Sequence, residues 1–371
     1  MCEVQDIFAE HGEAYRLEHE MSAVQEKAFD AIRRCRTSAL GGHIDVCPEC
    51  GAAEQSYNSC RNRHCPKCQS YKMAKWVEEQ SRSLLDIPYF HVVFTVPEEL
   101  NVVFMHNQAE MYGLLFRASA KTLAELCADE KYLGARGGHT AVLHTWGQNL
   151  SYHPHVHCIV PSGGLTEGGG WKNSSAKFFL PVKVVSAVFR GKLLDELKGM
   201  RLRFYNAAAA LADPEEFARL VDALYLKDWV VYCKRPFGNS AAVVGYLGSY
   251  THRVAISNAR VISCEGGVVR FRWRDYRDGG KVKVMELSAV EFIRRFLMHI
   301  LPKGFMKVRH YGLLSNSVRG KKIGLMKRLT GTPLREYAEI DPAELVERLI
   351  GRPPGTCRYC GAGLVGYPLL A

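Results

Sequence analysis

The stretch SYHPHVHCIVP, residues 151–161, carries two histidines in the alternating pattern of a β-strand. Alternate residues of a strand point to the same face, so His155 and His157 would present two imidazoles side by side, with Val156 on the opposite face. Two imidazoles can bind a divalent metal and leave positions for a third ligand, water and a phosphate oxygen. A single His-X-His pair also occurs in strands that bind nothing, so the surrounding sequence has to decide.

Three neighbouring side chains are candidates for a third ligand. Gln148 lies seven residues before His155, at the end of the preceding predicted strand, and a tight connection would bring its carbonyl towards the pair. We therefore expect Gln148 to complete the site, with magnesium or manganese as the metal, since oxygen ligands favour these ions. His153 has the right alternation, but Pro154 is expected to interrupt the strand there. His144 is a more distant alternative.

Two tyrosines, Tyr246 and Tyr250, lie four residues apart in the segment 239–250, which has the features of a short helix. Residues i and i+4 share one face of a helix, so the two phenols would face the same way. A phenol can attack a phosphodiester when a metal polarises the phosphate, and the resulting phosphotyrosine ester stores the bond energy for rejoining. Taken alone, the pair is also compatible with two aromatic residues packed in the core.

Two Cys-X-X-Cys pairs, Cys47/Cys50 and Cys65/Cys68, are separated by 14 residues and predict one structural zinc site. Each pair aims two thiolates at one point, and two pairs complete a closed tetrahedral site that serves folding and DNA docking rather than catalysis. Alternate ligands in the same stretch are His43, Cys60 and His64.

A third pair, Cys357 and Cys360, has no obvious partner in the sequence and is either half of a second zinc site or a pair of thiols without a metal. The chain has 13 cysteines and no segment that resembles a secretion signal, so we expect thiols and metal ligands, not disulfides. It also has no run of about 18 apolar residues that would span a membrane. These features favour a cytoplasmic protein that does not bind membranes.

Basic residues are concentrated in the last third of the chain. The net charge is +11, and residues 231–371 contain 24 basic and 10 acidic residues. Such an excess favours a polyanionic partner, most simply nucleic acid, although a solubilising surface is the alternative. Candidate contacts to DNA phosphates are Arg253, Lys281 and Lys283.

The order of helical and strand patterns predicts an α+β fold with antiparallel pairing. PYFHVVFTVP, residues 88–97, is rich in β-branched and aromatic residues and predicts a buried strand. Residues 139–148 and 155–160 predict further strands, whereas 5–35 has helical periodicity. Two glycines at 266–267 predict the turn of a hairpin. Ordinary core or polar roles are expected for His91 and His139.

Taken in order, these motifs resemble a known family. The series comprises the cysteine pairs, HVVFTVP (91–97), HPHVHCIVPSGG (153–164), YLGSYTHRVAISN (246–258) and RRFLMHILPKGFMKVRHYG (294–312). It resembles the bacterial rolling-circle transposases of the insertion-sequence family numbered ninety-one. These belong to the HUH superfamily of single-strand endonucleases, together with plasmid replication initiators and relaxases.

The resemblance implies a compact antiparallel sheet flanked by helices, with the histidines on a central strand and the tyrosines on a helix facing it. His155 and His157 match the metal-binding histidines, Gln148 the polar third ligand, and Tyr246 and Tyr250 the paired catalytic tyrosines. The four cysteines of the first two pairs match the family's N-terminal zinc-binding domain. The expected domains are a zinc-binding domain (1–86), an HUH nuclease domain (87–265) and a basic C-terminal region (266–371).

The implied activity is the nicking of single-stranded or hairpin-forming element ends by tyrosine transesterification, with magnesium or manganese as the catalytic metal and zinc as a structural ion. The expected partners are the element ends, target DNA, and host helicase and replication proteins. Alternatives are a plasmid replication initiator or relaxase, a non-catalytic zinc-containing DNA-binding protein, and a metal-dependent hydrolase that forms no covalent adduct.

Overall fold

The strand predicted over residues 88–97 lies near the centre of the fold. In the computed structural model, β3 (Tyr89–Thr95) is buried along its whole length between β5 (Tyr152–Pro161) and β8 (Val231–Phe237). With β4 (Gly138–Trp146) and β12 (Val308–Gly312) these strands form one sheet in the order β12-β4-β5-β3-β8, and every neighbouring pair is antiparallel. The structure describes residues 2–175, 179–237, 242, 243, 245, 246, 248, 255–334 and 339–369.

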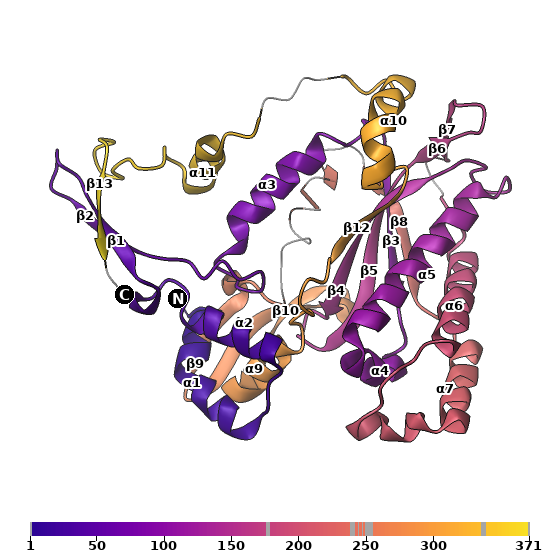
Figure 1. The fold of residues 1–371 in the computed structure, drawn as a ribbon, viewed down its shortest axis with the longest axis horizontal. Coiled ribbons are helices and arrows are strands. Elements are labelled where there is room, and N and C mark those ends of the chain that lie inside the picture. The colour runs from indigo at the N-terminus through magenta and orange to yellow at the C-terminus, as the bar shows by residue number, and fades with distance from the viewer. Residues whose placement is uncertain are drawn as a thin grey trace.

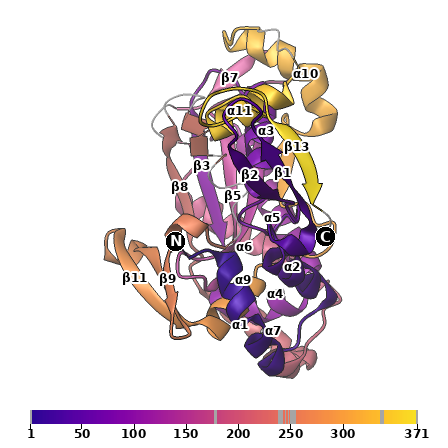
Figure 2. The same ribbon diagram turned by 90° about the vertical axis from the view of Figure 1, so that its left-hand side faces the viewer.

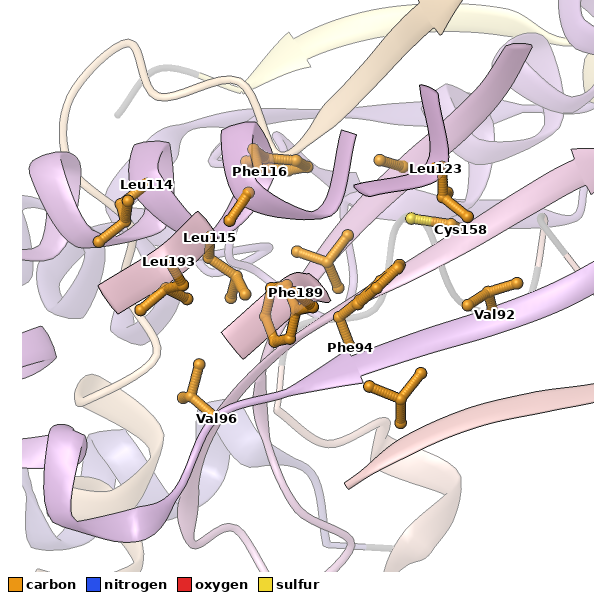
Figure 3. Close-up of a cluster of buried hydrophobic side chains, with 14 of the residues drawn as sticks. Val92, Phe94, Val96, Leu114, Leu115, Phe116, Leu123, Cys158, Phe189 and Leu193 are labelled. Atoms are coloured by element: carbon orange, nitrogen blue, oxygen red, sulfur yellow. The ribbon is translucent and has the colours of Figure 1, made fainter. Parts of the chain in front are cut away.

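One face of this sheet is covered by two long helices, α5 (Gln108–Ala128) and α6 (Val182–Lys198), which lie beside it in Figure 1. Phe94 of β3 packs against Phe189 of α6, with ring centroids 4.8 Å apart, and Figure 3 shows both within the main apolar cluster. The helices α4 (Asn101–His106) and α7 (Pro214–Leu226) contribute to the same layer. Because alternate strand residues share a face, the remaining side chains of β3 and β5 point the other way.

The opposite face of the sheet packs against α3 (Gln69–Ser81) and Val243. Among the described residues, Tyr89, Ile159 and Val243 form a small apolar cluster on this face, against which Trp76 of α3 packs. This face also carries the histidines of the predicted site.

The helical pattern over residues 5–35 is divided in the structure into α1 (Val4–Glu18) and α2 (Ala23–Arg33). The second helix begins because Ser22 caps it: its side chain accepts a hydrogen bond from the amide of Gln25, whose own side chain bonds back to the amide of Ser22. The two helices therefore form an antiparallel pair rather than one rod.

This helix pair shares a core with a second sheet from the other end of the chain. The predicted hairpin is confirmed as β9 (Val261–Glu265) and β10 (Val268–Asp275), to which β11 (Lys281–Ser288) adds a third strand. The helix α9 (Ala289–Leu297) follows, and its Phe296 packs edge-on against Phe8 of α1 with ring centroids 5.3 Å apart.

The C-terminal part of the chain returns to the N-terminal part. The helices α10 (Asn316–Leu329) and α11 (Pro342–Ile350) lead to β13 (Val365–Leu369), which pairs with β1 (Gly42–Val46). Figures 1 and 2 show this return, with α11 beside α3 and β13 beside β1. Two short ribbons, β2 (Ala53–Tyr57) on β1 and β6 (Gly163–Leu165) with β7 (Trp171–Asn173), complete the fold.

The predicted division at residues 86 and 265 stays a prediction. The helices of the first segment and the strands of the last share one hydrophobic core, and β1 pairs with β13. None of the helices in the described part of the chain is both long and apolar enough to cross a membrane.

A buried histidine in this framework predicts destabilisation by acid. His299 is buried, accepts from Thr145 and donates to the carbonyl of Leu150, and burial lowers its pKa to about 4. An unfolded histidine titrates near 6.5, so below that pH the unfolded state binds a proton that the folded state does not, and stability is lost. We expect the difference in unfolding free energy between the wild type and His299→Gln to shrink by roughly 2 kcal/mol from pH 7 to pH 5. Urea titrations at the two pH values measure it, and an unchanged difference would contradict the assignment.

Candidate active site and metal sites

Three histidines from two neighbouring strands converge on the α3 side of the sheet. His155 and His157 lie on β5, and His144 lies on β4 directly opposite His155 in the antiparallel register. One ring nitrogen from each of the three lies within 4.8 Å of the others. The ring centroids of His144 and His157 are 4.4 Å apart, and those of His155 and His157 are 4.8 Å apart. This donor set fits a divalent metal with open coordination positions.

Burial keeps the imidazoles of His155 and His157 neutral, which is the form that can bind a metal. Desolvation lowers the pKa of His155 to about 3 and lowers that of His157 well below its ordinary value. Both side chains are therefore neutral at pH 7, and a neutral imidazole offers a lone pair to a metal without first releasing a proton.

The phenol of Tyr246 lies against this histidine cluster. Its oxygen is 3.0 Å from Nδ1 of His157 and 2.8 Å from Nε2 of His91, and these two ring nitrogens are 2.8 Å apart. The rings of His91 and His157 are stacked, 5.1 Å between centroids. The sequence predicts an ordinary core or polar role for His91, and β3 places it beside β5 with its side chain on the face that carries the three-histidine cluster.

The structure separates the candidates for the third ligand. Gln148 lies in the turn between β4 and β5, where its backbone carbonyl accepts a hydrogen bond from Arg260. Contrary to the prediction, Pro154 does not break the strand, because β5 begins at Tyr152 and runs through it. The register of β5 with β4 shifts at this position, so Pro154 needs no hydrogen-bond partner on β4. The carbonyl of His153 lies 2.6 Å from Nδ1 of His155. His144 is the candidate that the strand pairing brings to the pair.

Tyr250 and Arg253 lie outside the described residues, as does most of the predicted helix 239–250. Lys281 and Lys283 are described and form ion pairs: Lys281 with Asp278 at 3.0 Å, and Lys283 with both Asp275 and Asp278 at 2.9 Å. Their role in DNA binding stays a prediction.

The cysteines form two clusters instead of the single predicted site of Cys47, Cys50, Cys65 and Cys68. The first cluster contains Cys65 and Cys68 together with Cys35 and the alternate Cys60, and all four sulfurs lie within 4.8 Å of one another. The Sγ atoms of Cys35 and Cys68 are 3.4 Å apart, and those of Cys60 and Cys68 are 3.6 Å apart. A tetrahedral zinc with Zn–S bonds of 2.3 Å would hold its sulfurs about 3.8 Å apart, so this cluster fits zinc.

The second cluster joins Cys47 and Cys50 to the third pair, Cys357 and Cys360. The backbone amides of Cys360 and Tyr359 stabilise the Cys357 thiolate and lower its pKa to about 6. The sequence predicts one site for the first two pairs because they are neighbours along the chain, but β13 brings Cys357 and Cys360 closer to Cys47 and Cys50.

The two histidine alternates have other roles. His64 is buried, and its Nε2 accepts a hydrogen bond from the amide of Leu301 at 3.1 Å. His43 lies on β1 and pairs with Asp45 at 3.1 Å. Neither belongs to a metal-binding group among the described residues.

Three residues of these clusters are not among the residues that the sequence favours. Cys35 lacks the Cys-X-X-Cys spacing, so no local pattern identifies it. His144 is the more distant alternative to Gln148, and the strand register places it opposite His155. His91 opens the HVVFTVP motif, but only the pairing of β3 with β5 shows which way its side chain points.

The chain is similar to known transposases. Residues 7–96 match the family model described as "Transposase zinc-binding domain", and residues 138–322 match the one described as "Putative transposase". The chain is 47% identical to "Putative transposase y4qJ" of Sinorhizobium fredii (strain NBRC 101917 / NGR234), covering 97% of this chain and 93% of that protein. It is 30% identical to "Transposase for insertion sequence element IS801" of Pseudomonas savastanoi pv. phaseolicola, covering 92% and 83%.

Among solved structures, the conjugative relaxase TrwC in its metal-bound complex with oriT DNA is 16% identical, with a TM-score of 0.23. The match covers 32% of this chain and spans less than half, 46%, of that chain.

The family matches and both relatives define the class, which is that of DNA transposases. The chain belongs to the rolling-circle transposases of the insertion-sequence family numbered ninety-one, the family that its motifs resemble. The zinc-binding domain of that family includes the whole of the first cysteine cluster.

Proposed function

We propose that this transposase nicks single-stranded ends of its element with Tyr246 as the attacking nucleophile. The observation that carries the proposal is the contact between the Tyr246 phenol and His157, a member of the three-histidine cluster. In the reaction, the phenol oxygen forms a bond to the scissile phosphorus while the bond to the 3′-oxygen breaks. The products are a 5′-phosphotyrosine ester and a free 3′-hydroxyl that can prime replication.

The catalytic metal is held by His144, His155 and His157. His157 uses Nε2, since its Nδ1 faces Tyr246 and His91, and a hydrogen-bonded second nitrogen is usual for a metal-binding histidine. A bound divalent cation would polarise the phosphate and stabilise its developing charge. Three imidazoles suit manganese better than magnesium, which prefers oxygen ligands.

His91 orients the nucleophile. Burial lowers the pKa of His91 to about 4, so its imidazole is neutral at pH 7 and can accept the hydroxyl proton of Tyr246 in a hydrogen bond. The same nitrogen also contacts His157, which ties the phenol to the metal side of the site. We assign Tyr250 the second strand transfer, because two nucleophiles suit two successive transesterifications. The element ends and target DNA are the substrates, and host helicase and replication proteins would supply unwound strands.

The test is a covalent-adduct assay. Purified protein is mixed with end-labelled single-stranded DNA that carries the element ends, with manganese, with magnesium, or with a chelator, and is resolved on a denaturing gel. A protein-linked label that requires metal and is stronger with manganese is the expected result. Cleavage without an adduct would indicate a hydrolase, and binding without cleavage would indicate a non-catalytic DNA-binding protein; either outcome would overturn the proposal.

The third ligand gives a separate prediction. We expect His144→Ala to weaken manganese binding by more than about 100-fold, the upper range for losing even an outer-shell partner of a metal site. Gln148→Ala should bind manganese like the wild type and still fold, because the contact of Gln148 with Arg260 uses the backbone carbonyl. Calorimetric titration with manganese compares the two, in protein whose cysteine clusters hold zinc and from which all other zinc has been removed. The reverse pattern would make Gln148 the ligand.

A further inference from the structure

Two copies of one sequence pattern, CPECGA at 47–52 and CRYCGA at 357–362, form the same turn. In both, the amide of the first cysteine donates to the carbonyl of the final alanine, at 2.8 Å in the first turn and 2.7 Å in the second. In both, the glycine amide donates back to the carbonyl of the first cysteine, at 3.0 and 2.9 Å. Both glycines have positive φ angles, 71° and 79°, which a glycine adopts without strain. Each turn therefore presents two sulfurs in the same way.

The two turns face each other, although Cys50 and Cys357 are 307 positions apart in the sequence. The Sγ atoms of Cys47 and Cys360 are 3.4 Å apart, those of Cys50 and Cys357 are 3.7 Å apart, and all four lie within 4.8 Å. These separations are close to the roughly 3.8 Å between sulfurs around a tetrahedral zinc, and too long for a disulfide bond. The antiparallel pairing of β1 with β13, from Gly42 opposite Leu369 to Val46 opposite Val365, holds the turns in register.

We propose that Cys47, Cys50, Cys357 and Cys360 form a second zinc site that joins the two ends of the chain. It is distinct from the cluster that contains Cys35. Neither of the family matches reaches Cys357 or Cys360, since they cover residues 7–96 and 138–322.

This site holds the C-terminal segment against α3. Around the cluster, Arg352 and Arg358 pair with Glu54 of β2 at 3.3 and 3.4 Å. Further along, Arg348 of α11 pairs with Glu78 of α3 at 3.3 Å, and Figure 2 shows α11 over α3. Such ion pairs near the surface contribute little by themselves, so the attachment depends on the pairing of β1 with β13 and on the zinc.

The helix α3, to which the C-terminal segment is attached, lies on the face of the sheet that carries the histidine cluster. Trp76 of α3 packs against the apolar cluster that includes Val243 and borders Tyr246. A Cβ built on Gly248 would lie 3.0 Å from the Cγ2 of Val77, so α3 also lies directly against Gly248, two residues after Tyr246. Zinc at the second site would thus brace the helix that supports the nucleophile.

The first experiment counts zinc by mass spectrometry in the full-length protein. Cys357→Ser/Cys360→Ser is expected to lose one zinc per chain relative to the wild type, Cys47→Ser/Cys50→Ser to lose one, and the quadruple variant to lose only one. Cys60→Ser/Cys68→Ser should lose a different ion, so combining it with Cys357→Ser/Cys360→Ser should remove two. The control Cys2→Ser/Cys233→Ser should lose none. Retention of full zinc by Cys357→Ser/Cys360→Ser, or the loss of two by the quadruple variant, would overturn the proposal.

Hydrogen exchange tests the attachment in the same variants. Amide exchange over β13 and α11 should accelerate at least about tenfold in Cys357→Ser/Cys360→Ser, while β3 and β5 keep their protection. The single variant Cys360→Ser changes only an exposed side chain, so it should show the same pattern if the double variant folds poorly. Unchanged exchange over β13 and α11 after loss of the zinc would overturn the role in attachment. These readouts do not depend on DNA cleavage, so they stand apart from the test of Tyr246.

Discussion

Replacement of Tyr246 by phenylalanine is expected to reduce the covalent protein–DNA adduct at least about 1,000-fold, because it removes the oxygen that forms the new bond to phosphorus. The ring is kept, so its packing against the cluster of Tyr89, Ile159 and Val243 should be preserved. The measurement is the initial rate of adduct formation on end-labelled single-stranded DNA at saturating manganese. Binding of uncleaved DNA should change little.

Two further tyrosine variants serve as controls for this result. Tyr205→Phe changes an exposed tyrosine beside His106, far along the chain from the site, and should leave the rate unchanged. Tyr250→Phe should still form the first adduct and lose the second transfer. If Tyr250→Phe abolished the first adduct while Tyr246→Phe retained it, the order of the two nucleophiles would be reversed. The contact of Tyr246 with His157 would then not mark the first nucleophile.

The second large effect is expected at the first cysteine cluster. Cys35 is fully buried just after α2, where the cluster adjoins the core shared by α1, α2 and α9. Structural zinc in small domains contributes on the order of 10 kcal/mol to folding, which is comparable to the whole stability of a typical domain. We therefore expect Cys35→Ser to lose one zinc and to leave this core largely unfolded, as measured by zinc content, near-ultraviolet circular dichroism and thermal unfolding.

Cys127→Ser is the matched control for burying a hydroxyl. Cys127 is also buried but belongs to none of the metal-binding groups in the described part of the chain. Its replacement should keep all bound zinc and cost only about 1–3 kcal/mol, the usual penalty for a buried hydroxyl without a good partner. If Cys35→Ser were no worse than Cys127→Ser and kept its zinc, Cys35 would not be a ligand.

Local patterns in the sequence were sufficient to predict much of the sheet that carries the histidine cluster. The alternation in HPHVHCIV places His155 and His157 on one side of a strand and Val156 on the other, and the structure has this arrangement on β5. HVVFTVP predicts a buried strand, and β3 is buried throughout. These predictions succeed because alternation and β-branched composition act over a few residues, which is the range that a strand's own geometry covers.

The choice of partners depended on the tertiary structure. Which histidine completes the cluster follows from the register of β4 with β5, and the role of His91 follows from the register of β3 with β5. Neither register can be predicted from a short stretch of the sequence, because it depends on how two separate strands pair.

For the cysteines, too, the local sequence predicts one part of the arrangement and the tertiary structure decides the other. Spacing alone predicts that the Cys-X-X-Cys turns offer zinc ligands, since each turn aims two sulfurs at one point whatever the rest of the chain does. It paired the wrong turns, because the first and third turns are joined only when β13 lies beside β1. A metal site needs four ligands at one point in space, and distance along the chain does not measure distance in the folded protein.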